Sequence, residues 1–570
     1  MKKKSPFNMI LTLCLVTSTL LQPMTLNNEW TFAGRASWRT SAVDIVNSGK
    51  FGADGDNLTW QYDSSHTLTI KGSGEMENWE GVARPWGLYQ QYIESIVLEN
   101  GVTNIGISAF YHCDSLTSVT IPDSVTSIGG GAFSYCGKLH TVEIPNSVTS
   151  IGECAFLSCS NLRSVIIPDS VISIGIAAFA HCTSIEKVVI PDSVNSLESQ
   201  MFMYCDSLMS VSLPDNLIHI GEGAFTHCTS LASINLPACL TDIGNDVFSY
   251  CNSFDTITIP EGVTSIGEYA FEYCQLLSSV SIPESMETIG IGAFRECGSL
   301  TEFTVNPNNR NFIDIEGILF NKDCSTLVRY PSARSTTTYV IPESVTTIWH
   351  HAFDGCKNFV SITIPNSITS IGNSAFSGCK SLSSIRIPDG VREISTDLFV
   401  GCTSLSSIHL PEGITSIGAS AFSRCEGLSS ITIPKNVTDV DSGAFNKCTN
   451  LECIVFSNPS CQIYDWEKTI HESTSIYGYD GSTAQSYSKK YKRTFLNLDT
   501  VLGDVNSDGA INADDANLAL LAYLDEAIMQ IPMQLDVKQK IAADYNMDGQ
   551  ISADDANAIL LRYLDIFMQE

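Results

Sequence analysis

Two short segments near the C-terminal end carry oxygen-bearing side chains at the spacing of a calcium-binding loop. GDVNSDGAINADD begins at Gly503 and ADYNMDGQISADD begins at Ala543, and each fits D-x-N-x-D-G-x-I-x-x-x-D. Calcium is a hard cation that takes oxygens at loop positions 1, 3, 5 and 12 and a backbone carbonyl at position 7, with Gly in the sharp turn at position 6. We therefore expect two Ca²⁺ ions, with these ligands: Asp504, Asn506, Asp508, the Ala510 carbonyl and Asp515, then Asp544, Asn546, Asp548, the Gln550 carbonyl and Asp555.

A helix is predicted to leave each loop and to position its last ligand. The segments ADDANLALLAYL and ADDANAILLRYL follow the two loops and nearly repeat each other. Two features differ from ordinary EF-hands, since position 12 is Asp rather than Glu and no convincing helix enters the first loop. From Val501 to the end the net charge is −10, about a third of the −31 of the whole chain. This shift in composition places a domain boundary near Val501.

The duplicated loop and helix, from about Val501 to Leu564, resembles a type I dockerin. The resemblance implies calcium-dependent folding and docking onto a cohesin of a scaffolding protein, as in the cellulosomes of anaerobic bacteria. An unrelated acidic calcium module remains the alternative. The Ser-Thr pair of one well-known dockerin group is missing at loop positions 10 and 11, so the class of cohesin stays open. The cohesin contacts that the resemblance implies lie at loop positions 10 and 11 and along the exit helices: Ala513, Asp514, Leu520, Leu521, Ala553, Asp554, Leu560 and Leu561.

A 23-residue repeat fills most of the 570-residue chain. Each repeat has a Phe followed three residues later by a Cys, and a single unit cannot bury its apolar residues, so stacked units must share one core. The Val-x-Ile alternation before Pro122 predicts a short strand, and Ala132-Phe133 with Cys136 predicts a tight helical turn. The repeated Phe residues are Phe110, Phe133, Phe156, Phe179, Phe202, Phe225, Phe248, Phe271, Phe294, Phe353, Phe376, Phe399, Phe422 and Phe445.

LTSVTIPDSVTSIGGGAFSYC and its relatives closely resemble the leucine-rich repeats of the BspA-like family of bacterial surface proteins. The resemblance implies a mainly β solenoid that works as an adhesin or protein-binding module. It also implies atypical segments at both ends of the array. We expect a signal peptide at 1–25, a strand-rich N-terminal cap at 26–92, repeats at 93–456 with an irregular insertion at about 301–341, a C-terminal cap and linker at 457–500, and the α-helical, calcium-binding dockerin at 501–570.

Two features inside the array, the insertion and the repeated Cys residues, each allow a purely structural interpretation and a functional one. We interpret the insertion as one degenerate coil with a bulged loop. The loop is either a surface insertion whose sequence has drifted without effect or a loop that recognises a partner. Fourteen of the 20 Cys belong to the repeat column. Their spacing permits disulfides, but a thiol is also a good small apolar filler, and reduced buried thiols are favoured for most of the column. Cys453 and Cys461 are the better candidates for a bond.

Composition and motifs exclude several function classes. The acidic charge argues against nucleic acid and anionic membranes as partners. Lys2 to Lys4 and the apolar run to Leu21 predict secretion, and no other segment is apolar enough to insert into a membrane. No G-x-S-x-G, H-E-x-x-H or P-loop spacing occurs, so we expect no enzyme, although a hydrolase with an unrecognised site stays open.

The leading hypothesis is a secreted, non-catalytic binding protein attached to a cellulosome-type complex. Its repeats would bind an unidentified protein partner, and its calcium-loaded dockerin would bind cohesin. The alternative is a component that binds plant polysaccharide through the Trp-rich N-terminal segment, since Trp rings stack on sugars. A cap core is the simpler explanation of Trp60, Trp79 and Trp86; Trp30 and Trp38 lie in the same segment.

Overall fold

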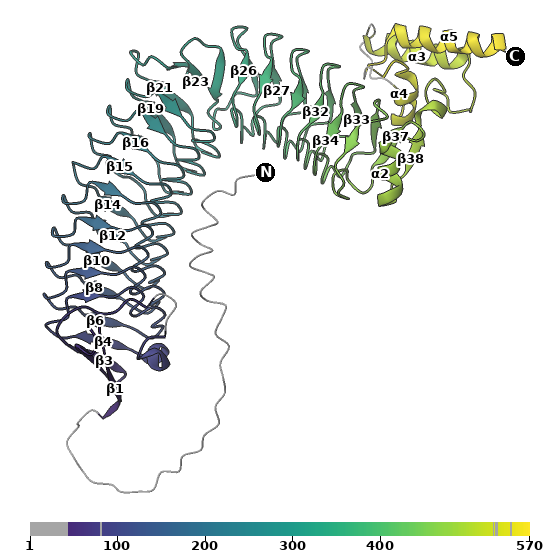
Figure 1. Ribbon diagram of the computed structural model, residues 1–570. Coiled ribbons are helices and arrows are strands. Elements are labelled where there is room, and N and C mark those ends of the chain that lie inside the picture. The colour runs from purple at the N-terminus through teal and green to yellow at the C-terminus, as the bar shows by residue number, and fades with distance from the viewer. Residues whose placement is uncertain (1–43, 80–82, 528, 530–533, 548–549, 570) are drawn as a thin grey trace, which may run out of the picture. The chain divides into compact units, whose positions relative to one another are not determined.

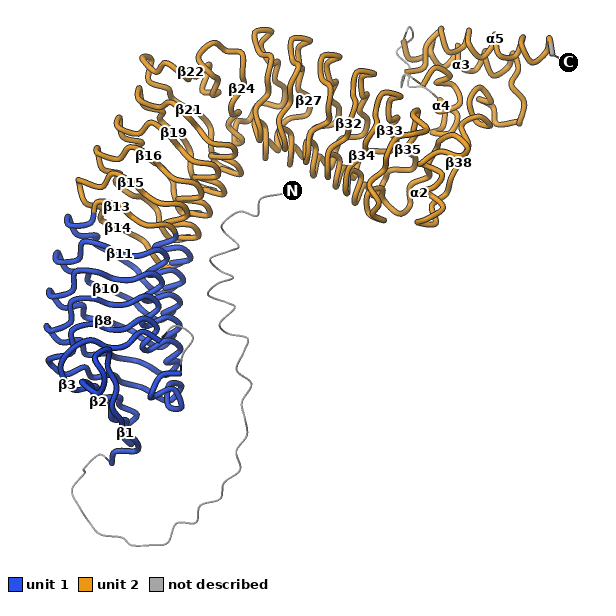
Figure 2. Tube along the Cα trace, in the orientation of Figure 1, with its two compact units in different colours: residues 1–194, 200–206 blue, residues 195–199, 207–570 orange. Residues whose placement is uncertain are grey.

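The computed structural model describes residues 44–79, 83–527, 529, 534–547 and 550–569. They fall into two compact units, one formed by residues up to 194 together with 200–206, and the other by 195–199 and the residues from 207 onward (Figure 2). The division falls inside the repeats. The expected signal peptide lies outside the described residues, as do Trp30, Trp38 and the proposed ligand Asp548.

The first unit begins with a mixed sheet and continues as stacked coils with two short strands each (Figure 1). The mixed sheet pairs β1 with β2 and β2 with β3 antiparallel, and β3 with β4 and β4 with β6 in parallel. Its strands are β1 (Ile45–Phe51), β2 (Leu58–Asp63), β3 (Thr67–Gly72), β4 (Ser95–Leu98) and β6 (Ser118–Thr120), with the 3-10 helix η1 (Gly87–Tyr92) between β3 and β4. The later coils add β8 (Thr141–Glu143), β10 (Ser164–Ile166) and β12 (Lys187–Val189) on one face and β5 (Asn104–Ile105), β7 (Ser127–Ile128), β9 (Ser150–Ile151) and β11 (Ser173–Ile174) on the other.

The second unit repeats this two-faced arrangement in parallel sheets. The first strands of its coils are β14 (Ser210–Ser212), β17 (Ile257–Thr258), β19 (Ser279–Ile282), β21 (Glu302–Val305), β25 (Thr338–Val340), β27 (Ser361–Thr363), β29 (Ser384–Arg386), β31 (Ser407–His409), β33 (Ser430–Ile433), β35 (Cys453–Phe456), β37 (Ser475–Gly478) and β38 (Phe495–Asn497). The second strands are β13 (Ser196–Leu197), β15 (His219–Ile220), β16 (Asp242–Ile243), β18 (Ser265–Ile266), β20 (Thr288–Ile289), β26 (Thr347–Ile348), β28 (Ser370–Ile371), β30 (Glu393–Ile394), β32 (Ser416–Ile417), β34 (Asp439–Val440) and β36 (Gln462–Ile463).

Helices occur at the end of the second unit. The array is closed by α2 (Thr483–Tyr491) and the 3-10 helix η2 (Leu498–Thr500). The C-terminal module, which we define as residues 501–569, contains α3 (Ala513–Ala527), α4 (Val537–Ala543) and α5 (Ala553–Gln569). Both predicted exit helices are therefore present, and each begins at loop position 10. In the described part of the chain, none of the helices combines the length and the apolar character that a membrane span needs.

The repeated Phe side chains form a stacked column inside each unit. Neighbouring ring centroids are 5.3–5.7 Å apart from Phe110 to Phe202 in the first unit. The spacing is 5.2–5.7 Å along Phe225 to Phe294 and Phe353 to Phe445 in the second. These separations suit offset stacking, which adds to the hydrophobic gain from burying each ring. The expected shared core is confirmed.

The Cys column is reduced, and its thiols have a structural role. None of the 19 described cysteines forms a disulfide, so Cys453 and Cys461, the better candidates for a bond, are not joined. Cys251 is fully buried and its Sγ–H donates to the carbonyl of Phe225 in the preceding coil, at 3.3 Å. The same bond recurs along the column at 3.0–3.3 Å. Each thiol therefore fills a small apolar slot and satisfies a buried carbonyl. Burial raises the pKa of Cys402 to about 12 and also raises the pKa of Cys274 and Cys379, which disfavours the reactive thiolate form at these positions.

The predicted helical turn is wrong, because the residues around each Phe form successive tight turns. Gly131 and Tyr135 flank Phe133 with φ of 60° and 63°, and the equivalent residues of the other coils are also left-handed. The backbone N–H of Phe133 donates to Ala155 of the next coil at 2.8 Å rather than to its own turn. Bonding between coils replaces the i→i−4 bonding that a helix requires.

The insertion at 301–341 is one coil that carries a hairpin. β21 extends the sheet of first strands, and β24 (Thr326–Arg329) extends the sheet of second strands by pairing with β26. Between them, β22 (Phe312–Ile315) and β23 (Ile318–Asn321) pair antiparallel. Tyr330 stacks on Phe353 with ring centroids 5.4 Å apart and thereby fills the Phe slot. The expectation of one degenerate coil is confirmed, and its bulge is an ordered hairpin.

A buried charge cluster joins the coils on either side of this hairpin. Asp354 is fully buried and accepts from Arg295 Nε at 2.9 Å, and Arg295 also donates to Glu272 at 2.6 Å. Arg329 donates to the backbone carbonyls of His351 and Asp354. Burial by itself would raise the pKa of Asp354, but the neighbouring His351, Arg329 and Arg295 lower it. The cluster thus holds a carboxylate ionised in the core where the repeat is broken.

Candidate functional site

The first predicted calcium loop, residues 504–515, closes on its own position-1 carboxylate. The backbone N–H of Asp508 donates to Asp504 Oδ1 and that of Gly509 donates to Asp504 Oδ2, both at 3.0 Å. Gly509 has φ 87°, a left-handed value that favours glycine, so the sharp turn expected at position 6 is present. The backbone of the first loop thus has the turn that its motif predicts, and its ligand assignments stay predictions.

The carboxylates at position 12 are placed identically in the two loops. Asp515 and Asp555 are both fully buried. Each accepts from the backbone N–H of position 3 at 3.0 Å and from that of position 9 at 2.9 Å. Each also lies in the first turn of its exit helix, where the helix dipole favours a negative charge. The helices therefore hold the last expected ligand of each loop against the loop backbone.

The second loop, residues 544–555, has a different entrance from the first. α4 leads directly into it, with Asp544 as the C-cap residue, whereas the first loop follows a 3-10 turn. Asp536 and Gln539 form a capping box at the start of α4. The sequence did not predict α4, because the helix has only seven residues and its apolar pattern is short. The capping box D-V-K-Q is the signal that could have found it.

The donor set of the two loops agrees in kind with calcium. The expected ligands are carboxylate, amide and carbonyl oxygens, which are the ligands of a hard cation. In the described ranges, no group of three or more His, Cys, Asp or Glu side chains converges as a metal site. In the first loop the carboxylates instead accept backbone N–H bonds, and Asn506 Nδ2 donates to Asp508 at 3.0 Å. The expected ligands are therefore of the chemical kind that Ca²⁺ takes. They are not all carboxylates, because the two sets include the side chains of Asn506 and Asn546 and two backbone carbonyls.

All eight predicted cohesin contacts are exposed to solvent. Ala513, Asp514, Ala553 and Asp554 lie at the exposed starts of α3 and α5. The four leucines are exposed by large fractions for apolar side chains, at 37%, 56%, 39% and 63% for Leu520, Leu521, Leu560 and Leu561. The opposite sides of the helices are buried, with Ala516, Ala519, Ala556 and Ile559 in the core of the module. Matching leucine pairs on both helices are therefore unburied in this chain.

The three described Trp side chains of the N-terminal cap lie in its core. Trp60, Trp79 and Trp86 are at most 5% exposed. Trp86 stacks on Phe110 at 5.8 Å and donates its indole N–H to the Ala109 carbonyl at 3.1 Å. Trp86 thus begins the aromatic column of the array. The cap-core interpretation is confirmed for these three residues, and their faces are not available to a sugar.

The outward faces of the coils are polar over most of the array. First strands such as β8, β27 and β29 expose their first and third residues, which are mostly Ser and Thr, and bury the second. Ile166 and Val189 depart from this pattern in the first unit and are exposed by 74% and 64%. Arg386 and His409 depart from it in the second unit, where they are register partners on β29 and β31.

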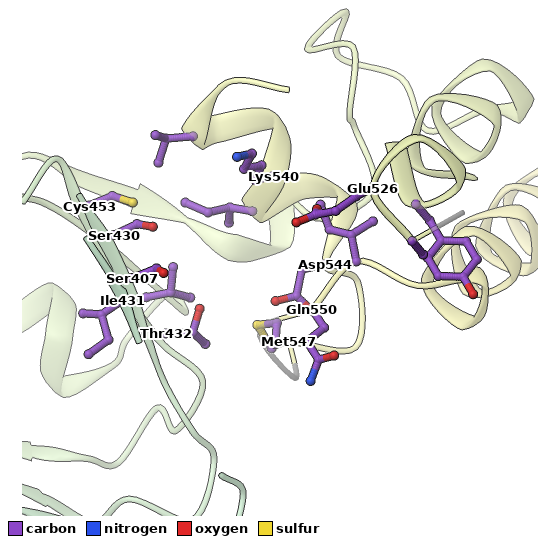
Figure 3. A pocket seen from close by; sticks show the side chains of 16 residues that line it. Ser407, Ser430, Ile431, Thr432, Cys453, Glu526, Lys540, Asp544, Met547 and Gln550 are labelled. Atoms are coloured by element: carbon purple, nitrogen blue, oxygen red, sulfur yellow. The ribbon is translucent and has the colours of Figure 1, made fainter. Parts of the chain in front are cut away.

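A crevice of about 490 Å³ lies between the last coils and the C-terminal module, within the second unit (Figure 3). Ser407, Ser430 and Thr432 line it from the array, and Lys540 and Met547 line it from the module. Nothing in the motifs predicted this crevice. The available signal was the replacement of outward Ser and Thr by Cys453 and Val455 in the last repeat.

A family model for the BspA type leucine rich repeat region matches the chain in six copies, over residues 88–209, 195–327 and 330–452. Among solved structures, the chain is similar to a leucine-rich cell surface protein from Faecalibacterium prausnitzii, with 31% identity, a TM-score of 0.49, and coverage of 73% of this chain and 96% of that one. It is also similar to a leucine-rich repeat protein from Bacteroides ovatus, with 26% identity, a TM-score of 0.45, and coverage of 70% and 95%. No curated protein matches the chain in sequence. Because the family model covers more than half of its residues, the chain belongs to the BspA-type leucine-rich repeat family.

Proposed function

We propose that this leucine-rich repeat protein is a secreted, non-catalytic binding protein that docks onto a cohesin-bearing scaffold of the cellulosome type. Two calcium ions would organise its C-terminal module as a type I dockerin. The observation that carries the proposal is the duplication in three dimensions. Both loops hold a buried position-12 Asp in the same hydrogen bonds, and both exit helices leave a Leu pair exposed.

The exposed leucines support a protein partner for the module. An apolar pair on a helix, next to the polar residues at loop positions 10 and 11, is the composition of an interface with an apolar centre and a polar rim. The repeats offer a second surface, the polar outward face of the first strands, for a separate protein partner. We assign the repeats no catalytic role.

The alternative function, binding of plant polysaccharide through the N-terminal Trp residues, has weaker support. Trp60, Trp79 and Trp86 are buried, so they have no free ring face for a sugar. Retention of the calcium-loaded full chain on cellulose or xylan would favour this alternative, and we expect none.

The decisive experiment is cohesin capture with calcium and with EDTA. We expect the full chain to bind an immobilised type I cohesin in calcium and to be released by EDTA. The double variant Asp504→Ala, Asp544→Ala should bind neither calcium nor cohesin, because each loop loses its expected position-1 ligand. The variant Asp525→Ala, which lies in α3 outside both loops, is the matched control. Capture that survives EDTA would refute the dockerin assignment.

A further inference from the structure

In the regular array, the backbone N–H groups around each repeated Phe donate to carbonyls of the next coil. In the coil of Phe271, the N–H of Tyr269 donates to the carbonyl of Ile291 at 3.0 Å, and the N–H of Phe271 donates to that of Ala293 at 2.8 Å. These bonds satisfy buried donors and join one coil to the next.

This ladder of bonds stops at the last coil before the hairpin. Gly292 and Phe294 are the equivalents, 23 residues further on, of Tyr269 and Phe271. The coil itself is still regular, since Gly292 has φ 66° against 55° for Tyr269 and the ring of Phe294 stacks on Phe271 at 5.4 Å. Gly292 and Phe294 are buried, yet in the described part of the chain neither N–H has a backbone acceptor. Buried N–H groups without a partner are rare and costly, so these two need an acceptor that the next coil does not supply.

A small cavity lies next to these two N–H groups. It has a volume of about 20 Å³, and Gly292, Phe294 and Arg295 line it together with Arg329 and His351. Arg329 brings a third donor, because this side chain is only 4% exposed and its Nε has no partner among the described residues. Its two Nη groups already donate to backbone carbonyls. Three buried N–H donors therefore line one cavity.

The lining of this cavity favours an anion. Arg295 and Arg329 bring positive charge to it, and the described residues that line it include no carboxylate. Asp354 is held by Arg295 Nε and lies outside the lining. A water molecule has only two lone pairs and needs acceptors for its own hydrogens, whereas an anion accepts from every donor around it. Consecutive turns with N–H groups on one side are a common anion-binding arrangement in proteins.

We propose that this cavity binds one monatomic anion, chloride under ordinary conditions, between the coil of Phe294 and the coil that carries the hairpin. The anion accepts from the backbone N–H groups of Gly292 and Phe294 and from Arg329 Nε, and so replaces the carbonyls that a regular coil would supply. The volume suits a particle about the size of a water molecule and is too small for sulfate or phosphate. The site goes beyond the proposed function and does not depend on calcium.

The test measures chloride binding to the full chain by the line width of the chloride-35 NMR signal, with sodium bromide as competitor. Ala293→Val fills the cavity with a residue that the array accepts at the equivalent position, Val247. Ala270→Val makes the same change one coil earlier, where the ladder is complete, and is the matched control. Arg329→Lys keeps the charge and removes the Nε–H.

We expect the wild type and Ala270→Val to bind one chloride that bromide displaces. Ala293→Val should abolish this binding. Arg329→Lys should weaken it by about tenfold or more, the usual effect of losing one hydrogen bond to a charged group. A wild type that does not broaden the chloride signal would overturn the proposal, as would equal binding by the wild type and Ala293→Val.

Crystals of the wild type grown in sodium bromide supply a readout that needs no variant, which matters if Arg329→Lys does not fold. The proposal expects an anomalous bromide peak within hydrogen-bonding distance of the Phe294 backbone nitrogen and Arg329 Nε. Density at that place without anomalous signal would identify a water molecule and overturn the proposal. None of these results bears on calcium or cohesin binding, so the proposed function stands or falls separately.

Discussion

The regular coils of the second unit and the coil that carries the hairpin bury polar groups by different means. In the regular coils, each Phe carbonyl finds a thiol one coil away, as with Phe225 and Cys251. At the hairpin the period is broken, and Asp354, Arg295 and Arg329 fill the gap with charges. Arg329 Nε, His351 Nδ1 and Asp354 Oδ1 are buried there and find no hydrogen-bond partner among the described residues. In this array the regular repeat buries neutral hydrogen bonds, whereas its one described interruption buries ionic groups, whose removal from water is costly.

Breaking the charge cluster should have the largest effect. Asp354→Ala leaves Arg295 and Arg329 without their buried carboxylate, and loss of one partner of a buried pair costs about 3–5 kcal/mol. The measurement is the free energy of unfolding in urea. Ser377→Ala changes the same column one regular coil later and should cost less than about 0.5 kcal/mol. Equal losses of unfolding free energy in the two variants would show that the charge cluster contributes no more to stability than the equivalent position of a regular coil.

Removing one thiol from the regular column should have an intermediate effect. Cys251→Ala leaves the buried Phe225 carbonyl unsatisfied, which costs about 1–3 kcal/mol. Cys239 is exposed, and Cys239→Ala should be close to neutral in the same urea titration. If Cys251→Ala is as stable as the control, the thiol is only a filler.

The turn residue two positions after each Phe also differs between the coils before and after the hairpin. Substitutions there should change stability less than those above. Before the hairpin this left-handed position often carries stacked rings, with Tyr250 4.2 Å from His227 and 4.5 Å from Tyr273. In the first three coils after the hairpin it holds Gly355, Gly378 and Gly401, and in the last two it holds Arg424 and Lys447. Tyr250→Ala should cost about 0.5–1.5 kcal/mol, because it loses the stacking and keeps the left-handed strain. Tyr250→Gly should cost less, since Gly relieves that strain. Thermal unfolding of the two variants side by side checks the order.

The contribution of a buried Asp to stability should change with pH in opposite directions in a regular coil, at Asp246, and in the charge cluster, at Asp354. Burial, then Glu272, Glu222 and Glu268, raise the pKa of Asp246 from 3.8 to about 6. The folded state therefore binds this proton more tightly, and the contribution of Asp246 to stability falls as the pH rises from about 4 to 6. Asp246→Asn should remove that fall and make the protein relatively more stable at pH 7. A wild type and variant with parallel stability profiles between pH 4 and 7 would contradict this.

Asp354 supplies the opposite case. Its pKa is lowered, so its ionised form contributes stability above its usual pKa, and that contribution is lost as the pH falls. The same carboxyl chemistry therefore has opposite effects in the two regions, depending on whether its neighbours are carboxylates or guanidinium groups.

Much of the architecture was predictable because the repeat is strict. The constant spacing of Phe and Cys allows only a stacked core, and the loop motifs place Asp515 and Asp555 at helix starts. The turn around Phe133 was mispredicted as helical, because an apolar Ala-Phe-x-x-Cys pattern suits a helix and the bonding partners of the turn lie in the next coil. The charge cluster at the hairpin could not be predicted from the sequence. Arg295 and Asp354 are 59 residues apart in the chain and meet only because their coils stack.

The sequence by itself determined the family and the solenoid, because both depend on local spacing repeated many times; it also predicted the candidate ligands from two matching loops and favoured, without deciding, a reduced thiol column. Only the tertiary structure decided which part of the array the C-terminal module packs on. Val505 of the first loop and Ile541 of α4 share one apolar cluster with Cys453, Val455 and Tyr477 of the array, and these residues are brought together only by the fold. Local patterns specify conformation, but which surface a loop meets depends on where the rest of the chain brings it.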